Sequence, residues 1–252
     1  MRTAAILPVK SFTRAKQRLS STVADALRRE LAAAMVLDVL AALARTDAIE
    51  RTIVVTREQH VVPHAREHGA ILIEDQAEAG QSAAVTLGVH RALGEGFERV
   101  LCVPGDCPAL DPAELDALLG APARAGSRDR ERPAQVGAPA RAGSRDRERP
   151  AQVVIIPDRH GTGTNGLLLS PPQAIAPSFG PDSCERHRAL ARAAGIACRI
   201  ERLPSLLLDI DTRADLDALR ARLSGHRAGA LRTRALLGQP ERSLPLSINT
   251  PA

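Results

Sequence analysis

The chain has 252 residues, of which 44% are hydrophobic, so it can form one large α/β domain or two small ones with a sizeable core. It has no tryptophan, no tyrosine and three phenylalanines, which argues against the aromatic platforms on which single-stranded nucleic acids stack. No stretch of about 18 apolar residues occurs, so we expect no membrane-spanning segment.

The positive charge is unevenly distributed. Of the net charge of +5, residues 120–153 carry +4 and residues 224–252 carry +3, which leaves about −2 on the remainder. The basicity therefore belongs to two appendages and not to a nucleic-acid-binding surface. The four cysteines have no zinc-like spacing, and the N-terminus lacks a signal-peptide pattern. We therefore expect a reduced, cytoplasmic protein.

Short apolar runs alternate with helical patterns, which predicts a single, mostly parallel sheet flanked by helices. The strands are expected at residues 4–9, 51–56, 70–73, 100–103, 153–156, 167–169, 198–201 and 206–211. The helices are expected to begin near residues 21, 58, 81, 112, 184 and 213, and to end near residues 45, 68, 93, 119, 194 and 223.

Two segments in the first half have features of a nucleotide site. The loop at residues 10–19 carries Lys10, Lys16 and two arginines, which is enough charge to hold a triphosphate. An ordinary solvated loop is the alternative. Gly80 precedes the helix that begins near residue 81, and a glycine there lets backbone amides approach a base or a phosphate.

The stretch at residues 99–112, RVLCVPGDCPALDP, organises the site. Its apolar strand is stopped by Pro104 and Gly105, and Asp106 follows directly. The carboxyl ends of strands in an open α/β sheet are where ligands bind. A carboxylate there suits a Mg²⁺ ion that carries a nucleotide phosphate. The alternative is an ordinary strand-to-helix turn, where Asp is common.

Residues 120–136, GAPARAGSRDRERPAQV, are repeated without change at residues 137–153. The unit is rich in Ala, Arg, Pro and Gly and has no apolar periodicity, so we expect a flexible loop without chemistry. The domain prediction is therefore one domain at residues 1–223, interrupted by this loop, with a disordered tail at residues 224–252.

The segment at residues 157–166, PDRHGTGTNG, is a polar loop that can wrap an anionic group, and Thr164 lies near its end. After Gly180, Ser183 is the predicted N-cap of the next helix, whose N-terminus attracts phosphate. His187 lies one turn into that helix, and we interpret it as a packing or surface residue and not as a base.

The run LLLDID at residues 206–211 ends in two acids, Asp209 and Asp211. In an extended chain their spacing directs both side chains to one side. We expect this strand to end at the same sheet edge as Asp106, where a hard cation would offset the repulsion among three carboxylates. Thr212 and Asp215 predict a capping box for the last helix. The absence of GxxxxGK[ST] excludes a P-loop.

Five segments in order, LPVKSFTRAKQRL, GDCPAL, DRHGTGTN, FGPDS and LLDIDT, resemble the guanylyltransferase family of deazaflavin-coenzyme biosynthesis. The resemblance covers residues 1–223 apart from the duplicated loop. It implies a Rossmann-like fold similar to that of molybdenum-cofactor nucleotidyltransferases. It also implies transfer of GMP from GTP to phosphoenolpyruvate, 2-phospho-L-lactate or 3-phospho-D-glycerate, with release of pyrophosphate.

The resemblance also implies residue roles. Mg²⁺ would be held by Asp106, Asp209 and Asp211. The phosphate and carboxylate of the small acid would be bound by Thr164, Gly180 and Ser183. GTP would be faced by Lys10, Lys16, Gly80 and Gly105. Where the family has Gly-Leu-Asn, this chain has Gly80-Gln81-Ser82, so the guanine contacts stay unassigned.

The expected partners are these two small molecules, without nucleic acid or membrane, and a homodimer is allowed. Two alternatives stay open. One is a related nucleotidyltransferase with a sugar-phosphate or molybdenum-cofactor acceptor, which different acceptors would reveal. The other is a non-catalytic protein that binds GTP without releasing pyrophosphate.

Overall fold

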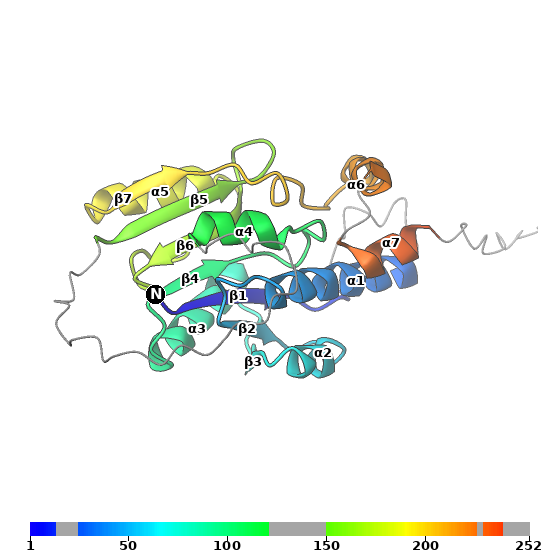
Figure 1. Ribbon diagram of the computed structural model, residues 1–252, viewed down its shortest axis with the longest axis horizontal. Coiled ribbons are helices and arrows are strands. Elements are labelled where there is room, and N and C mark those ends of the chain that lie inside the picture. The colour runs from blue at the N-terminus through cyan, green and yellow to red at the C-terminus, as the bar shows by residue number, and fades with distance from the viewer. Residues whose placement is uncertain (14–24, 121–149, 226–228, 239–252) are drawn as a thin grey trace, which may run out of the picture.

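The computed structural model describes residues 1–13, 25–120, 150–225 and 229–238. In these ranges seven strands form one sheet, with helices on both faces (Figure 1). The strands are β1 (Thr3–Val9), β2 (Arg51–Thr56), β3 (Ile71–Glu74), β4 (Arg99–Cys102), β5 (Gln152–Pro157), β6 (Thr164–Ser170) and β7 (Ala197–Ile200). The helices are α1 (Asp25–Ala44), α2 (Val61–Glu67), α3 (Gln81–Gly94), α4 (Pro112–Leu119), α5 (Ser183–Ala193), α6 (Arg213–Gly225) and α7 (Leu231–Leu237).

The strand order β3-β2-β1-β4-β6-β5-β7 confirms the predicted, mostly parallel sheet. β6 is antiparallel to both of its neighbours, and the other strands share one direction. The exception arises because β5 returns directly into β6 as a hairpin, whereas parallel neighbours need a longer crossover. The start of β6 therefore lies at the same edge as the carboxyl ends of β4 and β5, which is the edge where α/β sheets bind ligands.

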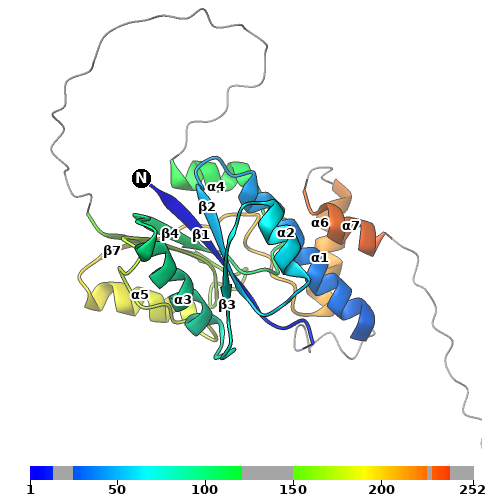
Figure 2. The ribbon, with the colours of Figure 1, turned by 90° about the horizontal axis from the view of Figure 1, so that it is seen from below.

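Helices cover both faces of the sheet, so the strand residues that point to either face are apolar. On β1, Ala5 and Leu7 belong to the core under α1, α2 and α4, whereas Ala4 and Ile6 belong to the core on the side of α3 and α5. Figure 2 shows these helices as two layers on opposite sides of the sheet. Each fully buried Leu or Ile contributes about 1.5–3 kcal/mol, so aliphatic side chains alone can stabilise this domain.

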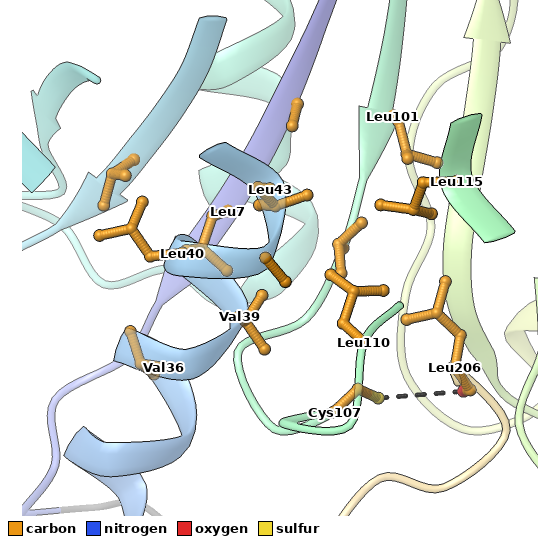
Figure 3. Packing of buried hydrophobic residues seen from close by; sticks show 14 of the residues in the cluster. Leu7, Val36, Val39, Leu40, Leu43, Leu101, Cys107, Leu110, Leu115 and Leu206 are labelled. Atoms are coloured by element: carbon orange, nitrogen blue, oxygen red, sulfur yellow. Dashed lines mark hydrogen bonds between the residues drawn. The ribbon is translucent and has the colours of Figure 1, made fainter. Parts of the chain in front are cut away.

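The core under α1 and α4 extends to the ligand edge of the sheet (Figure 3). Leu101 of β4 packs near Leu115 of α4, and Leu206 lies next to the turn that contains Cys107. The Cys107 thiol donates to the Leu206 carbonyl at 3.9 Å. Because Leu206 is fully buried, it anchors the chain just before the two acids at positions 209 and 211.

The predicted strand at residues 206–211 is wrong, because this segment pairs with no strand of the sheet. Its apolar residues made it resemble a strand, but they are buried by packing against the core and α1. One of its amides, that of Ile210, donates to the Asp106 carbonyl at 3.2 Å. The segment therefore reaches the ligand edge by docking on the turn after β4.

The predicted tail also needs a correction, because residues 231–237 form α7. The backbone amides of Arg232 and Thr233 donate to the Asp38 carboxylate of α1 at 3.0 and 2.8 Å. α7 therefore lies against α1 (Figure 1), where it shares a third apolar cluster with α6. A helix of seven residues is too short to give a clear periodic signal, so sequence reasoning missed it.

Some predictions fall on residues that the structure does not describe. These include most of the duplicated segment at 120–153 and residues 239–252, whose expected flexibility stays a prediction. In the parts of the chain that are described, no helix combines the length and the apolar character needed to cross a membrane.

Candidate active site

Asp106 lies in the turn after β4, at the sheet edge where ligands bind. This turn packs closely on α1, because a Cβ added to Gly105 would come within 2.7 Å of Val36 Cγ2. Glycine is therefore needed at this position for the turn to approach the helix. The close packing fixes the backbone that carries Asp106, whose Oδ1 is buried.

Asp209 is held next to this turn by Asn165, the second residue of β6. Asn165 Nδ2 donates to the Leu206 carbonyl at 2.7 Å and to Asp209 Oδ1 at 3.2 Å. Burial raises the pKa of Asp209 above its usual range, and the negative charges of Asp106 and Asp211 raise it further. The hydrogen bond from Asn165 lowers it in part. The raised pKa therefore reflects burial first, and then two further acids near enough to repel the Asp209 carboxylate.

These acids do not form a closed set of metal ligands. Among the described residues, no three His, Cys, Asp or Glu side chains are arranged to hold one ion. Mg²⁺ does not require such a set, since it is commonly bound by one or two carboxylates and completes its shell with water and substrate phosphates. A group of carboxylates that offers only oxygen ligands, and whose repulsion a cation would reduce, therefore fits Mg²⁺.

Asp215 shapes the turn that carries Asp211. The predicted capping box is confirmed: the Asp215 amide donates to Thr212 Oγ1 at 3.3 Å, and the Thr212 amide donates to Asp215 Oδ2 at 2.7 Å. The Asp211 amide donates to the same oxygen at 3.1 Å. On the other side, Arg159 Nη2 contacts Asp215 Oδ1 at 2.6 Å. Asp215 therefore joins the β5–β6 turn to the segment that bears the acids.

Thr164, the first residue of β6, faces away from the acids and towards α5. Its hydroxyl lies 3.1 Å from His187 Nδ1, and the other ring nitrogen, Nε2, accepts a hydrogen bond from the Ser178 amide at 2.9 Å. The Phe179 ring meets the imidazole edge to face, with 5.1 Å between centroids. His187 is completely buried, which agrees with its interpretation as a packing residue.

The loop before α5 forms the other wall of this region. Gly180 has φ = 115°, a conformation that residues with a Cβ rarely adopt. The predicted N-cap is wrong by one residue: Asp182, in the left-handed region, is the N-cap, and Ser183 is the first helical residue. The resulting tight turn lets the Ser183 amide donate to the Gly180 carbonyl at 3.1 Å. Ser183 as a residue is 1% exposed, and its hydroxyl makes no hydrogen bond to the described residues.

The same loop is fastened at two further points. Arg186 donates from Nε to Ser178 Oγ and from Nη2 to the Ser178 carbonyl, both at 3.1 Å, and from Nη1 to the Pro181 carbonyl. The Phe179 amide donates to Ser82 Oγ at 2.8 Å. Since Ser82 is in the first turn of α3, the loop is tied to the start of that helix.

The residues expected to face GTP are described only in part. Lys10 is exposed at the end of β1, whereas Lys16 lies outside the described residues. Gly80 is the N-cap of α3 with φ = 104°, and, its two chain neighbours aside, none of the described residues has an atom within 4 Å of the place that its Cβ would take. This space at a helix N-terminus is open to an anionic group. Gly105, by contrast, has a packing reason for being glycine.

Sequence reasoning assigned no role to Asn165 or Arg159, although each connects two parts of the site. A signal was available for Asn165, because a buried amide at the start of an apolar strand needs specific hydrogen-bond partners. None was available for Arg159, whose partner is distant in sequence. Arg213 pairs with Asp217 on the exposed side of α6.

Comparisons with known proteins agree with this architecture. The family model described as "Guanylyl transferase CofC like" matches residues 3–146, more than half of the chain. A phosphoenolpyruvate guanylyltransferase from Conexibacter woesei is 49% identical over 245 residues, which are 97% of this chain and 99% of that protein. A 2-phospho-L-lactate guanylyltransferase from Methanothermobacter thermautotrophicus is 31% identical over 216 residues, 86% of this chain and 83% of that protein.

Solved structures share the fold. A protein from Desulfovibrio desulfuricans G20, classed as a nucleotide-diphospho-sugar transferase, superposes with a TM-score of 0.65. The alignment covers 94% of each chain at 17% identity, which is evidence for the fold alone.

Proposed function

The chain belongs to the CofC-like guanylyltransferase family and is a nucleotidyltransferase, and we propose that it transfers GMP from GTP to a small phosphorylated carboxylic acid. The observation that carries this proposal is the placement of Thr164 and Asn165. Adjacent residues of β6 reach a donor-rich loop on one side and the acidic segment on the other. An anionic acceptor on the Thr164 side and a cation-bound triphosphate on the Asn165 side would therefore be held next to each other at the start of β6.

In the proposed reaction, a phosphate oxygen of the acceptor attacks the α-phosphorus of GTP. A new P–O bond joins acceptor and GMP, the bond to the bridging oxygen breaks, and pyrophosphate leaves. No covalent enzyme intermediate is needed, so catalysis depends on positioning and charge. The hydroxyls of Thr164 and Ser183 and the backbone around Gly180 would hold the acceptor.

Asp106, Asp209 and Asp211 would hold Mg²⁺, whose charge would offset that of the phosphates. Two features support this role: the oxygen-only donors and the raised pKa of Asp209. Asn165 and the Asp215 turn orient the acids. Lys10, which follows β1, and the backbone amides after Gly80 would contact GTP at the same edge of the sheet.

Among acceptors we favour phosphoenolpyruvate, because the relative that is 49% identical bears that name. 2-Phospho-L-lactate and 3-phospho-D-glycerate are the alternatives, since they present the same phosphate and carboxylate. With any of the three, the product is a guanylylated acid with a phosphoanhydride bond, which we propose is consumed in deazaflavin-coenzyme biosynthesis.

The test is a coupled pyrophosphate assay of the purified chain with Mg²⁺. GTP, ATP, CTP and UTP are each combined with the three acids, a sugar phosphate and no acceptor. We expect pyrophosphate release with GTP and phosphoenolpyruvate, at a rate well above that of every other pair. Release only with the sugar phosphate would identify a different nucleotidyltransferase. GTP binding without release under any condition would identify a non-catalytic protein.

A further inference from the structure

The hydrogen bonds of His187 determine which ring nitrogen carries the proton. A backbone amide can only donate, so the Ser178 amide requires Nε2 of His187 to be an unprotonated acceptor. A neutral imidazole then carries its proton on Nδ1. Nδ1 lies 3.1 Å from Thr164 Oγ1, so the histidine donates and the hydroxyl oxygen accepts.

We propose that His187 is a positioning residue that makes the Thr164 hydroxyl a hydrogen-bond donor towards the acceptor site. With the His187 proton on its oxygen, the threonine must turn its own hydroxyl hydrogen away from the imidazole. His187 Nδ1 is the only hydrogen-bond partner of this hydroxyl within the described residues. The hydroxyl hydrogen therefore stays available for a ligand.

The surroundings of His187 keep this arrangement in place. The ring is fully buried, and Phe179 packs against it edge to face. Burial, and then the positive charge of Arg186, lower the pKa of His187 to about 4, so the imidazole is neutral at physiological pH. A protonated ring would turn Nε2 into a second donor facing the Ser178 amide, which the fixed loop could not accommodate.

This arrangement determines the chemistry of the ligand. A hydroxyl that already accepts a hydrogen bond from His187 keeps its own proton to donate, so it favours an oxyanion as its ligand over a group that can only donate. The inference rests on the proposed function for the identity of that oxyanion, the phosphate or carboxylate of the small acid. Because the same histidine holds Ser178, it also sets the distance between Thr164 and the loop at Gly180.

The first test reads the tautomer directly and does not depend on turnover. The full chain is labelled with ¹⁵N-histidine, and two-bond ¹H–¹⁵N spectra are recorded at neutral pH. The chain has seven histidines, and the His187 signal is assigned by its loss in His187→Gln. We expect a protonated Nδ1 and an unprotonated Nε2. A protonated Nε2 would overturn the proposal.

The second test separates the two hydrogen bonds of His187. Asn carries its amide near the place of Nδ1 and can still donate to Thr164, whereas Gln reaches the place of Nε2 and can accept from Ser178. We expect His187→Ala and His187→Gln to raise the KM for phosphoenolpyruvate about tenfold or more, with the KM for GTP changed less than twofold. His187→Asn should recover much of the loss. Rescue by Gln and not by Asn would mean that His187 only holds the loop.

Two further variants complete the test. Thr164→Val removes the hydroxyl at nearly constant shape and should match His187→Ala, and the double variant should be no worse than either alone. His90→Asn, at an exposed position of α3, is the matched control and should behave as wild type. If the histidine variants fold poorly, Thr164→Val together with the tautomer still decides: unchanged affinity for the acceptor would overturn the proposal.

Failure of the proposed function would look different. A wild-type chain that releases no pyrophosphate with any acid refutes the guanylyl transfer, whatever His187 does. In that case, calorimetric titration with phosphoenolpyruvate replaces the KM. Weaker binding by Thr164→Val and His187→Ala, but not by His90→Asn, would uphold the role of His187, and equal binding by all four proteins would refute it.

Discussion

The two sides of β6 have opposite electrostatic character. On the side of Asn165, burial raises the pKa of Asp209, and the nearby charges of Asp106 and Asp211 raise it further. On the side of Thr164, the hydrogen bonds join hydroxyls, the His187 imidazole, a backbone amide and Arg186, and the Asp158 carboxylate lies beside Gly163. On the Asn165 side, a bound cation would relieve the repulsion among the acids. On the Thr164 side, hydrogen bonds already hold the groups in place, and their donors suit an anion.

This contrast follows from strand geometry. Successive residues of a strand point to opposite faces, so neighbours in sequence can serve two different environments. Thr164 and Asn165 do so at the very start of β6, as their contacts show, at an irregularity of the ladder where Pro157 pairs with Thr164 and Ile156 pairs with Gly166. The difference shows how one short strand can hold a cationic and an anionic group close together without mixing their ligands.

Removing the charge from the acidic side should have the largest effect. We expect Asp106→Asn, Asp209→Asn and Asp211→Asn each to lower turnover by about 100-fold to 1,000-fold and to weaken Mg²⁺-dependent GTP binding, because the cation loses a carboxylate. Turnover and GTP binding should be measured against Mg²⁺ concentration.

The matched control for these variants is Asp217→Asn on the exposed face of α6, where Asp217 pairs with Arg213 and Arg220. It should stay within twofold of wild type, since surface ion pairs contribute little. If the acids served only as helix caps, Asn would replace Asp well and the three variants would keep near-normal activity.

Changing Asn165, which connects β6 to the acidic segment, should have the next largest effect. Asn165→Asp is nearly isosteric, but it loses both donations, to Leu206 and to Asp209, and adds another negative charge. We expect turnover to fall by about tenfold to 100-fold, and the free energy of unfolding to fall by about 1–3 kcal/mol. Steady-state kinetics and urea unfolding measure the two effects. Full activity would show that Asp209 needs no orientation by Asn165.

Changes on the Thr164 side, which we propose binds the anionic acceptor, should affect one substrate more than the other. Ser183→Ala and Thr164→Ala should raise the KM for the phosphorylated acid by about tenfold, and that for GTP much less, because each removes a hydrogen-bond donor to an anion. The measurement is the KM of each substrate with the other saturating. An equal rise in both values would contradict the assignment of this side to the acceptor.

The buried imidazole predicts a dependence of stability on pH. Burial lowers the pKa of His187 to about 4 in the folded chain, below its usual value near 6.5. Between these values the unfolded chain binds more protons, so this group lowers the free energy of unfolding as pH falls from about 6.5 to 4. The contribution is at most about 3 kcal/mol. Urea unfolding of wild type and His187→Asn across this range should show a smaller loss in the variant.

The smallest effect is expected away from both sides. Deleting residues 120–136, one copy of the repeat, should change neither turnover nor melting temperature appreciably. The entropy of closing a loop varies slowly with length, by about 0.6 kcal/mol per doubling. Activity and thermal unfolding of the shortened chain provide the check. Loss of folding would mean that the repeat contributes to the structure.

The sequence by itself determined most of the elements and the class of fold. Apolar runs and caps are local signals, so seven of the eight expected strands, and the Thr212 cap, were found where they were predicted. The glycine-bounded turn after β4 likewise put Asp106 at the ligand edge without any tertiary information.

Only the tertiary structure decided how the polar groups are connected. The segment at residues 206–211 is apolar like a strand, yet its partners are a helix, a turn and Asn165, which no local pattern reveals. The roles of His187, Asn165 and Arg159 likewise depend on partners 9 to 56 positions away. Hydrogen bonds between distant residues have no period in the sequence, so they emerge only when the chain is folded.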